Sequence, residues 1–392
     1  ATGKGKSLCM QSAGTLLGGV TLVIVPLLAL GADQVTKILR ANQAYGVVKG
    51  YHLDEIKTPE RRNMIIQELL HLNPDSKTSI FIFASPQAIV SNTAPWRGAI
   101  HNLHLKRLLR LVVIDELHLY LQFGLSLRSE FKKLTSLLLD KLFPPTDKRS
   151  HPALLVMTAT ISQRWLHIFH KMTNLSFLPK HILWGSPDDM ARRDVNISFF
   201  LGDSILKRMR GSLIHFLQST LYRKAILYSN TRNTALSLKD TIDNLMDAND
   251  IDGDSIVIHG ELESHTKFYR AKQFTGAHND GVLTPRVLVA TSGCANAGID
   301  CEDVYWVIRQ DMPPSILDLF QEMGRAARRM DKVFGTDHYI VIFSLSSFNY
   351  LFLRAHSQID DQTPPLILTK AEKTAIQLEA LMEVLDLLVL DY

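Results

Sequence analysis

Two adjacent carboxylates follow an apolar run near residue 115 and could do chemistry on a phosphate. Residues 112–114 are Val, Val and Ile, and Asp115 and Glu116 come directly after them. Such a run is typical of a buried parallel strand that carries its acids to the carboxyl edge of a sheet, where open α/β sheets bind ligands. Asp115 can hold Mg²⁺, and Glu116 can accept a proton from a water that attacks a γ-phosphate. For an isolated pair, a solvated turn is the alternative.

The chain starts with a glycine- and lysine-rich segment, ATGKGKS, that fits the second half of a phosphate-binding loop. Glycines allow backbone N–H groups to close around phosphate oxygens, Lys6 can reach the β- and γ-phosphates, and the Ser7 hydroxyl can bind Mg²⁺. A disordered Gly/Lys-rich terminus is the alternative, and the downstream acids favour the loop. The first glycine of the full pattern would precede Ala1, so we expect a fragment or a truncated gene product. The predicted nucleotide-binding residues are Thr2, Gly3, Lys4, Gly5, Lys6 and Ser7.

The composition is typical of a soluble globular protein. The 392 residues are 46% hydrophobic and carry a net charge of +4, which permits a nucleic-acid partner without requiring one. The longest apolar stretch, residues 18–32, contains Pro26 and is shorter than the roughly 20 residues that span a bilayer, so we predict no membrane partner. Cys9, Cys294 and Cys301 are too few for a four-cysteine zinc site and too scattered for a disulfide framework. We therefore expect reduced thiols, no zinc and an intracellular protein.

Strands alternate with helices through the first half of the chain, which indicates an α/β domain with a mostly parallel sheet. The expected strands cover residues 20–25, 79–83, 112–114 and 154–157, and the expected helices cover residues 8–17 and 60–70. We expect a loop over residues 119–128 and another helix from about residue 130. The hydroxyls of Thr158 and Thr160 follow a strand and could hydrogen-bond toward the acid pair.

A segment rich in Gly, Ser, Pro and Asp, residues 185–189, interrupts this pattern and predicts a domain boundary. The α/β pattern then begins again without a second phosphate-binding loop. The predicted domains are residues 1–190, residues 191–348 and a helical extension over residues 349–392. A helix over residues 316–325 leads to Arg325 and Arg328, which we expect at i and i+3 on one helix face, where they could supply cations to a γ-phosphate. A basic solvated helix is the alternative for this cluster.

The order of these motifs resembles that of superfamily 2 helicases, and within them the RecQ family of 3′-to-5′ DNA helicases. The resemblance is carried by ATGKGKS, VIVPLLALGADQ, FASPQ, VVIDELH, LQFGLSLR, MTATIS, ILYSNTR, VLVATSGCANAGID and QEMGRAARR. It extends from Ala1 to about Arg329 and implies two tandem RecA-like P-loop NTPase domains, with ATP and Mg²⁺ as cofactors. We expect a nuclear enzyme of DNA repair and recombination that couples ATP hydrolysis to translocation on single-stranded DNA and to duplex unwinding.

The resemblance also implies roles for individual residues. The catalytic set is Lys6, Asp115, Glu116, His118, Gln321, Arg325 and Arg328, with Ser7 and Asp115 on the metal and Arg328 as the arginine finger. His118 would relay the nucleotide state toward residues 158–160, and Gly298 and Asp300 would bind the nucleotide at an interdomain cleft. The implied nucleic-acid contacts are Pro26, Leu27, Asp33, Gln34, Ser85, Pro86, Gln122, Phe123, Arg128, Asn230, Thr231, Arg232 and Thr291.

Several positions depart from the family pattern. The family's loop after the acids usually has Trp, His, Asp and Phe where this chain has Phe123, Leu125, Ser126 and Leu127. Lys4 and Ala327 each stand where the family usually has glycine. A degenerate helicase-like module, which binds nucleic acid or nucleotide without unwinding, therefore stays open as an alternative. An RNA helicase of the DExH kind is less favoured, because residues 122, 124 and 128 follow the RecQ pattern.

Overall fold

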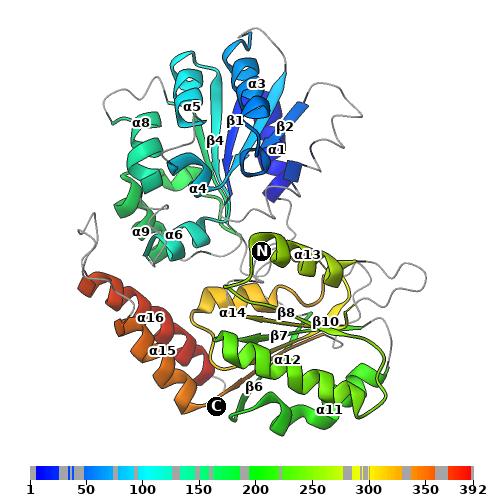
Figure 1. Cartoon of the computed structure of the whole chain (residues 1–392). Helices are drawn as coiled ribbons and strands as arrows, with labels where there is room; N and C mark the ends of the chain where they lie inside the picture. Colours follow the sequence, from blue (N-terminus) through cyan, green and yellow to red (C-terminus); the bar gives the residue numbers. More distant parts are fainter. Residues whose placement is uncertain are drawn as a thin grey trace. The chain divides into compact units, whose positions relative to one another are not determined.

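A computed structural model describes the chain as two compact units that divide between Trp184 and Gly185 (Figure 1). The described residues are 6–25, 34–35, 38, 48–73, 78–91, 96–125, 133–145, 151–158, 161, 163–185, 194–219, 223–276, 285–291, 294, 299, 301–328, 337–357 and 370–389. Each unit has its own parallel sheet and its own hydrophobic core. The predicted α/β class is confirmed by this architecture.

The first unit contains a five-stranded sheet in the order β2-β3-β1-β4-β5, and all neighbouring strands run parallel. Its strands are β1 (Gly19–Ile24), β2 (Val48–His52), β3 (Ser79–Ala84), β4 (Leu109–Ile114) and β5 (Ala153–Val156). Its α-helices are α1 (Lys6–Leu17), α3 (Pro59–Leu70), α4 (Pro86–Val90), α5 (Trp96–Leu105), α6 (Leu117–Leu125), α8 (Asp140–Leu142) and α9 (Gln163–Thr173). The unit also contains the 3-10 helices η1 (Leu53–Glu55) and η4 (Pro179–His181) and the π-helix η2 (Thr135–Leu139). The inner strands are almost entirely apolar because both faces of the sheet are covered.

Helix α1 lies close against this sheet, and a glycine makes the close approach possible. Met10 of α1 belongs to the same core cluster as Phe81 and Val113 of the sheet. A Cβ atom on Gly14 would lie 2.6 Å from ring carbons of Phe81 and 2.7 Å from Oγ1 of Thr21. The packing of α1 therefore depends on Gly14.

The second unit contains a six-stranded sheet in the order β6-β11-β10-β7-β9-β8, again with parallel neighbours. Its strands are β6 (Asn196–Leu201), β7 (Lys224–Ser229), β8 (Ser255–Ile258), β9 (Val287–Thr291), β10 (Val304–Gln310) and β11 (His338–Phe343). Its helices are α11 (Ile205–Ser219), α12 (Arg232–Asp247), α13 (Ser264–Thr275), α14 (Ile316–Met323), α15 (Leu345–Ser357) and α16 (Lys370–Val389).

Alternate residues of the second sheet point into two different cores. Leu227 packs with residues of α11 and α12 on one face, whereas Tyr228 packs with residues of α13 and α14 on the other. Helices on both faces explain why β7 is buried along its whole length. Helix α16 packs against α15 and α14, where Leu381 and Val384 join a small apolar cluster (Figure 1).

Two predictions about elements are wrong. Residues 119–128 were expected to form a loop, but residues up to Leu125 belong to α6, because Leu119, Tyr120 and Leu121 are buried and favour a packed helix. The helix expected over residues 316–325 ends at Met323. Strands β2, β6 and β11 were not anticipated. Helix α15 starts before the predicted boundary at residue 349 and lies in the second compact unit.

Across the described part of the chain, no helix has both the length and the apolar character needed to cross a bilayer.

The close approach at Gly14 can be tested by adding a methyl group. We expect Gly14→Ala to lower the free energy of unfolding by about 1 to 3 kcal/mol, because the new Cβ collides with the buried Phe81 ring. Gly98→Ala in α5 is the matched control: a Cβ there meets nothing within 4 Å, so the change should be neutral or stabilise by up to about 1 kcal/mol. Denaturant titration of both variants checks the prediction, and equal effects would contradict it.

Candidate nucleotide and nucleic-acid sites

Strand β4 delivers the acid pair to the carboxyl edge of the first sheet. The N–H of Asp115 donates to the carbonyl of Ile24 at 3.1 Å, so the pairing of β4 with β1 continues into the acid. On the other side, the N–H of Met157 donates to the carbonyl of Ile114 at 2.9 Å, and the N–H of Leu117 donates to the carbonyl of Met157 at 3.0 Å. The acid turn is therefore held between the ends of β1 and β5.

Glu116 has a strained backbone and a fixed carboxylate. Its φ is +50°, a conformation that side chains with a Cβ rarely adopt. The ammonium group of Lys6, at the first residue of α1, lies 3.1 Å from Oε1, and Nδ1 of His118 lies 3.3 Å from Oε2. The Lys6 and Glu116 side chains are 23% and 19% exposed, so a ligand in solvent can still reach them. The structure thus brings together three of the predicted catalytic residues.

The carboxyl group of Asp115 is easier to protonate than an ordinary aspartate. The pKa of Asp115 is raised to about 6. Burial is the main cause, and the negative charge of the neighbouring Glu116 carboxylate adds to the rise. Lys6 and a hydrogen bond from the N–H of Glu116 to Oδ1, at 2.9 Å, act in the opposite direction on the same pKa. A divalent cation would favour the ionised form, because it adds positive charge beside the buried oxygens.

His118 connects the acid turn to the segment after β5. The His118 ring is buried, and its Nδ1 lies 2.8 Å from Oγ1 of Thr158. The predicted meeting of His118 with Thr158 is therefore present in the structure, while its role as a relay stays a prediction. Ala159 and Thr160, which belong to the same motif, lie outside the described residues.

The Ser7 hydroxyl has an unexpected partner. Nε2 of Gln34 donates to Oγ of Ser7 at 2.8 Å, and Oε1 of Gln34 accepts from Nε2 of Gln11 at 3.3 Å. The family resemblance places Gln34 on a nucleic-acid path, whereas here its buried amide binds the phosphate-loop helix α1. The contact of Gln34 with nucleic acid stays a prediction, and in this structure its side chain is 4% exposed and bonded to α1.

These residues fit a nucleotide with a divalent cation. The Ser7 hydroxyl and the Asp115 carboxylate are hard oxygen donors of the kind that Mg²⁺ prefers, and Lys6 supplies a cation for phosphate oxygens. Mg²⁺ held there would neutralise charge on the phosphates. Among the described residues, no three His, Cys, Asp or Glu side chains converge as a metal cluster.

Ser85 and Pro86, predicted to contact nucleic acid, form the start of the short helix α4. Ser85 is buried, and both its N–H and its hydroxyl donate to the carboxylate of Asp54, at 2.9 and 2.5 Å. Its hydroxyl also accepts from the N–H of Ala88 at 3.2 Å and so caps the helix. The Ser85 side chain is therefore used to fix the backbone of this segment.

In the second unit, the predicted nucleic-acid residues follow β7. Thr231 caps α12, because its Oγ1 accepts from the N–H of Thr234 at 3.1 Å. Asn230 was expected to line the nucleic-acid path, but it is buried, and its Nδ2 donates to the carbonyl of Met312 at 2.9 Å. Asn230 therefore supports this segment, and its contact with nucleic acid stays a prediction. Arg232, at the first residue of α12, is half exposed and forms an ion pair with Glu261.

Thr291 is the last residue of β9, and its side chain is buried at the carboxyl edge of the second sheet.

The predicted arginine pair does not lie on a helix face. Helix α14 ends at Met323, and the chain turns back so that Nη1 of both Arg325 and Arg328 donates to the carbonyl of Ile299, at 2.6 and 3.3 Å. Ala327 between them has a φ of +52°. A glycine is favoured in that conformation, which explains the family's preference at this position. Gln321 is buried, and its amide has no hydrogen-bond partner among the described residues.

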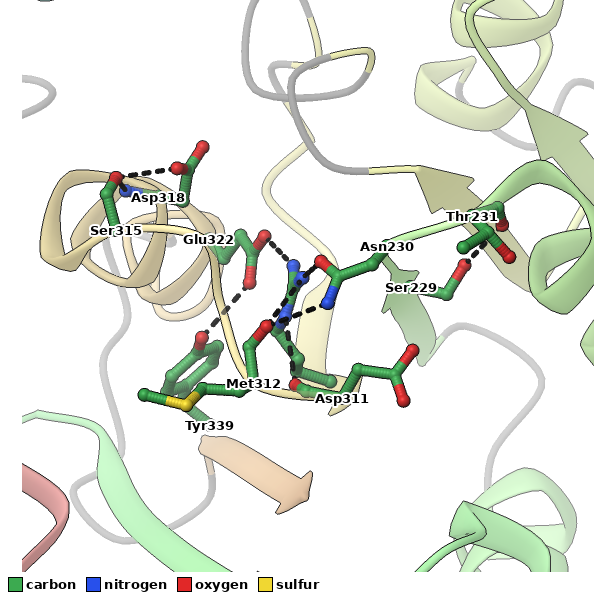
Figure 2. Close-up of polar contacts among 10 residues, drawn as sticks. Ser229, Asn230, Thr231, Asp311, Met312, Ser315, Asp318, Glu322 and Tyr339 are labelled. Carbon is green, nitrogen blue, oxygen red and sulfur yellow. Dashed lines mark hydrogen bonds and ion pairs between the residues drawn. The ribbon is translucent and has the colours of Figure 1, made fainter. Parts of the chain in front are cut away.

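One buried ion pair at this edge was not anticipated from the sequence. Arg309 of β10 pairs with Glu322 of α14, and both side chains are fully buried (Figure 2). Burial raises the pKa of Glu322 to about 7, while the guanidinium of Arg309 lowers it. A charged residue within an otherwise apolar strand, and a Glu within an apolar helix, are the sequence signals that could have indicated this pair.

Ten predicted site residues lie outside the described residues: Thr2, Gly3, Lys4, Gly5, Pro26, Leu27, Asp33, Arg128, Gly298 and Asp300. Gln122 and Phe123 have a described helical backbone in α6, but their side chains are outside the description.

Family models agree with the motif order and the two sheets. The model of the DEAD/DEAH box helicases matches residues 1–168, and the model of the helicase conserved C-terminal domain matches residues 209–330. The chain therefore contains both domains of a helicase core. Together the two matches include the acid pair, the phosphate-loop residues and the arginine segment.

Curated relatives carry RecQ-type names. The helicase is 27% identical over 335 residues to "Probable ATP-dependent DNA helicase RecS" of Bacillus subtilis, a match that covers 83% of this chain and 57% of the relative. It is 29% identical over 330 residues to "ATP-dependent DNA helicase RecQ" of Pasteurella multocida, with 84% of this chain and 45% of the relative covered. The predicted RecQ resemblance is thus confirmed. The helicase spans about half the length of these relatives.

Solved helicases share the fold. A structure titled as helicase MrfA bound to DNA gives a TM-score of 0.61 at 17% identity and covers 89% of this chain and 45% of that one. A structure of Mycobacterium smegmatis helicase Lhr bound to ssDNA and AMP-PNP gives 0.58 at 17% identity, with coverages of 91% and 45%. These matches confirm two tandem RecA-like domains.

The buried charge of Asp115 predicts a stability change that depends on pH. Its pKa of about 6 in the folded chain lies above the ordinary value of 3.8. The folded chain therefore binds this proton more tightly than the unfolded chain does. The resulting contribution to the free energy of unfolding is fully present below pH 3.8 and is lost as the pH rises through 6. We expect Asp115→Asn, without nucleotide or metal, to raise the free energy of unfolding at pH 7 by roughly 2 to 3 kcal/mol, and to change it little near pH 4. Denaturant titrations at both pH values measure this, and a stability gain that is the same at both would contradict it.

Proposed function

We propose that this helicase is the motor core of an ATP-dependent DNA helicase of RecQ type. The observation that carries the proposal is the arrangement of Glu116 between the Lys6 ammonium and the His118 imidazole, directly after the buried Asp115. This arrangement supplies a phosphate-binding cation, a metal-binding carboxylate and a proton acceptor at one edge of one sheet. The relatives' names, which describe ATP-dependent DNA helicases, support the same reading.

In the proposed reaction, each residue has a separate task. Lys6 binds oxygens of the β- and γ-phosphates of ATP, and Asp115 and Ser7 hold Mg²⁺. Glu116 accepts the proton of the attacking water, which requires its carboxylate to leave the Lys6 ammonium. Nδ1 of His118 lies 3.3 Å from the other oxygen of Glu116 and 2.8 Å from Oγ1 of Thr158, so a movement of Glu116 is passed on to Thr158 through this ring. The strained backbone of Glu116 fits such a role, because strain gathers where geometry must be fixed for function.

DNA is the proposed nucleic-acid partner. The relatives are named DNA helicases, and the MrfA and Lhr structures are described as bound to DNA and ssDNA. In this chain, Arg232 at the N-terminus of α12 can reach a phosphate, because its side chain is half exposed and helix N-termini favour anions. Movement in the 3′-to-5′ direction and nuclear localisation stay predictions from the resemblance, and the relatives include bacterial proteins.

A module that binds DNA without unwinding it is the second candidate. The residues after the acid pair favour this alternative, because Phe123, Leu125, Ser126 and Leu127 stand where the family has Trp, His, Asp and Phe. Turnover measurements separate the two candidates.

We expect purified wild-type chain to hydrolyse ATP faster when single-stranded DNA is added. Lys6→Ala should abolish turnover, because it removes the phosphate-binding cation. Glu116→Gln should bind ATP normally and lower turnover by about 10²- to 10⁴-fold, because the proton acceptor is lost while the metal ligand stays. A phosphate-release assay with and without oligo-dT measures these rates.

Glu60→Gln in α3 is the matched control for Glu116→Gln, since Glu60 is an exposed carboxylate of the same unit and should leave turnover unchanged. DNA binding without turnover in the wild type would select the binding module. Unchanged turnover in Glu116→Gln would refute the proton-acceptor role.

Arg328→Ala tests the proposed arginine finger. We expect turnover to fall by about 10³-fold or more with DNA affinity nearly unchanged, because an arginine finger stabilises charge only in the transition state. Arg328→Lys keeps the charge but not the forked donor geometry, and should recover only part of the rate. Turnover and fluorescence anisotropy with labelled oligo-dT give the two quantities. Loss of DNA affinity with normal turnover would instead assign Arg328 to the nucleic-acid contacts.

A further inference from the structure

The pairing of Arg309 with Glu322 is unusual because both side chains are fully buried. Removing two charges from water costs several kcal/mol for each ion, and apolar replacements of such pairs are often no less stable. Stability alone therefore does not explain why a strand in the middle of the sheet carries an arginine. The bonds that the guanidinium makes give a different reason.

The Arg309 guanidinium joins segments that are far apart in the sequence (Figure 2). Its Nη1 donates to Glu322 of α14, and its Nη2 donates to Oδ1 of Asn230, which follows β7. Its Nε donates to the carbonyl of Asp311 at 3.2 Å, and Nη2 also reaches the carbonyl of Met312 at 3.4 Å. One planar group therefore holds the end of β7, the end of β10 and helix α14 together.

Neighbouring groups reinforce each branch of this contact set. The hydroxyl of Tyr339 in β11 donates to Oε2 of Glu322 at 3.1 Å. The Nδ2 of Asn230 donates to the carbonyl of Met312 at 2.9 Å, so the amide uses both of its ends. Asp311 is held at a φ of +79° while its N–H donates to the carbonyl of Ile342 at 2.9 Å. A shift of any one of these segments would break bonds in the others.

The two outer branches lead directly to residues with proposed functions. Asn230 precedes Thr231, which caps α12, and Arg232, the proposed phosphate contact. Glu322 follows Gln321 and lies just before the turn that carries Arg325. The guanidinium of Arg309 is thus a direct connection between the proposed DNA segment and the proposed ATP segment of this unit.

We propose that Arg309 is a positioning residue that couples DNA contact at residues 230–232 to the placement of α14 and of the arginines that follow it. This coupling rests on the proposed helicase function. DNA bound at Arg232 restrains Asn230, Asn230 restrains the guanidinium, and the guanidinium restrains Glu322. DNA would then stimulate turnover through this buried contact.

The first test removes both charges together. In Arg309→Met/Glu322→Met the pair is replaced by apolar side chains of similar length, so the domain should fold, whereas Arg309→Met alone leaves a buried unpaired carboxylate. We expect turnover without DNA to stay within about twofold of wild type, and stimulation by oligo-dT to fall nearly to one. Retained stimulation in the folded double variant would overturn the proposal.

Lys224→Met is the matched control. Lys224 is a buried cation at the opposite end of β7, where its ammonium donates to the carbonyls of Phe274 and Gly276. Its loss should lower stability while leaving the stimulation ratio unchanged. Equal loss of stimulation in Lys224→Met would show that general destabilisation causes the effect.

A second readout does not depend on activity. Hydrogen exchange of the Thr234 and Ala235 amides, which bond to Thr231, reports the state of the DNA segment without any ligand. Relative to the Leu227 amide in β7, we expect exchange of the Thr234 and Ala235 amides to quicken by about tenfold in the double variant and not in Lys224→Met. Unchanged exchange would overturn the positioning role. If the wild type showed no DNA-stimulated turnover, the proposed helicase function would be rejected. The exchange measurement would still test whether Arg309 positions the segment at residues 230–232.

Discussion

A charged side chain at the end of a fully buried parallel strand needs a partner or loses its charge, and this constraint governs both units. In the first sheet, helices cover the faces, so polar groups can reach solvent only at the strand ends. Asp115 lies at such an end and is desolvated, which raises its pKa, and Lys6 opposes the rise. The position of Lys6 depends in turn on how closely α1 packs against the sheet, and Gly14 permits that approach. A packing detail in the core thus sets the electrostatics of the edge.

The second sheet meets the same constraint with the charges reversed. Arg309 brings a cation to the end of β10. Its charge is balanced by hydrogen-bond acceptors of the chain itself, which come from the ends of β7 and β10 and from α14. The second edge is filled by its own buried side chains, whereas the first edge keeps Glu116 within reach of solvent. The contrast agrees with a division of labour in which one unit does the chemistry and the other positions cations and DNA.

The sequence predicted what is local and missed what depends on packing. Lys6, Asp115 and Glu116 were found because their types and their positions beside an apolar strand identify the chemistry. Arg309 and Glu322 are 13 positions apart, on a strand and a helix, and their contact follows only from how α14 packs on the sheet. Gln34 was assigned to nucleic acid from its place in a motif, yet α1 offers it hydrogen-bond partners. The end of α14 at Met323 could not be predicted from the sequence either. It depends on a tertiary contact, the hydrogen bond from Arg325 to the carbonyl of Ile299.

Backbone strain is present at these edges, as it also is at Arg107, Asn174 and Asp250, which carry no proposed function. Glu116, Asp311 and Ala327 all have φ values between +50° and +79°, and each lies in a turn at the end of a strand or helix that carries proposed function. Such a conformation costs roughly 1 to 2 kcal/mol for a residue with a Cβ, so nearby bonds must hold it in place. Around Glu116 these are the backbone bonds of Asp115 and Leu117 to β1 and to the residue after β5; around Asp311 they are the Arg309 guanidinium and β11. The hydrogen bonds that hold each strained residue also fix the backbone of its turn. A fixed backbone in turn fixes the direction in which the side chains of that turn point.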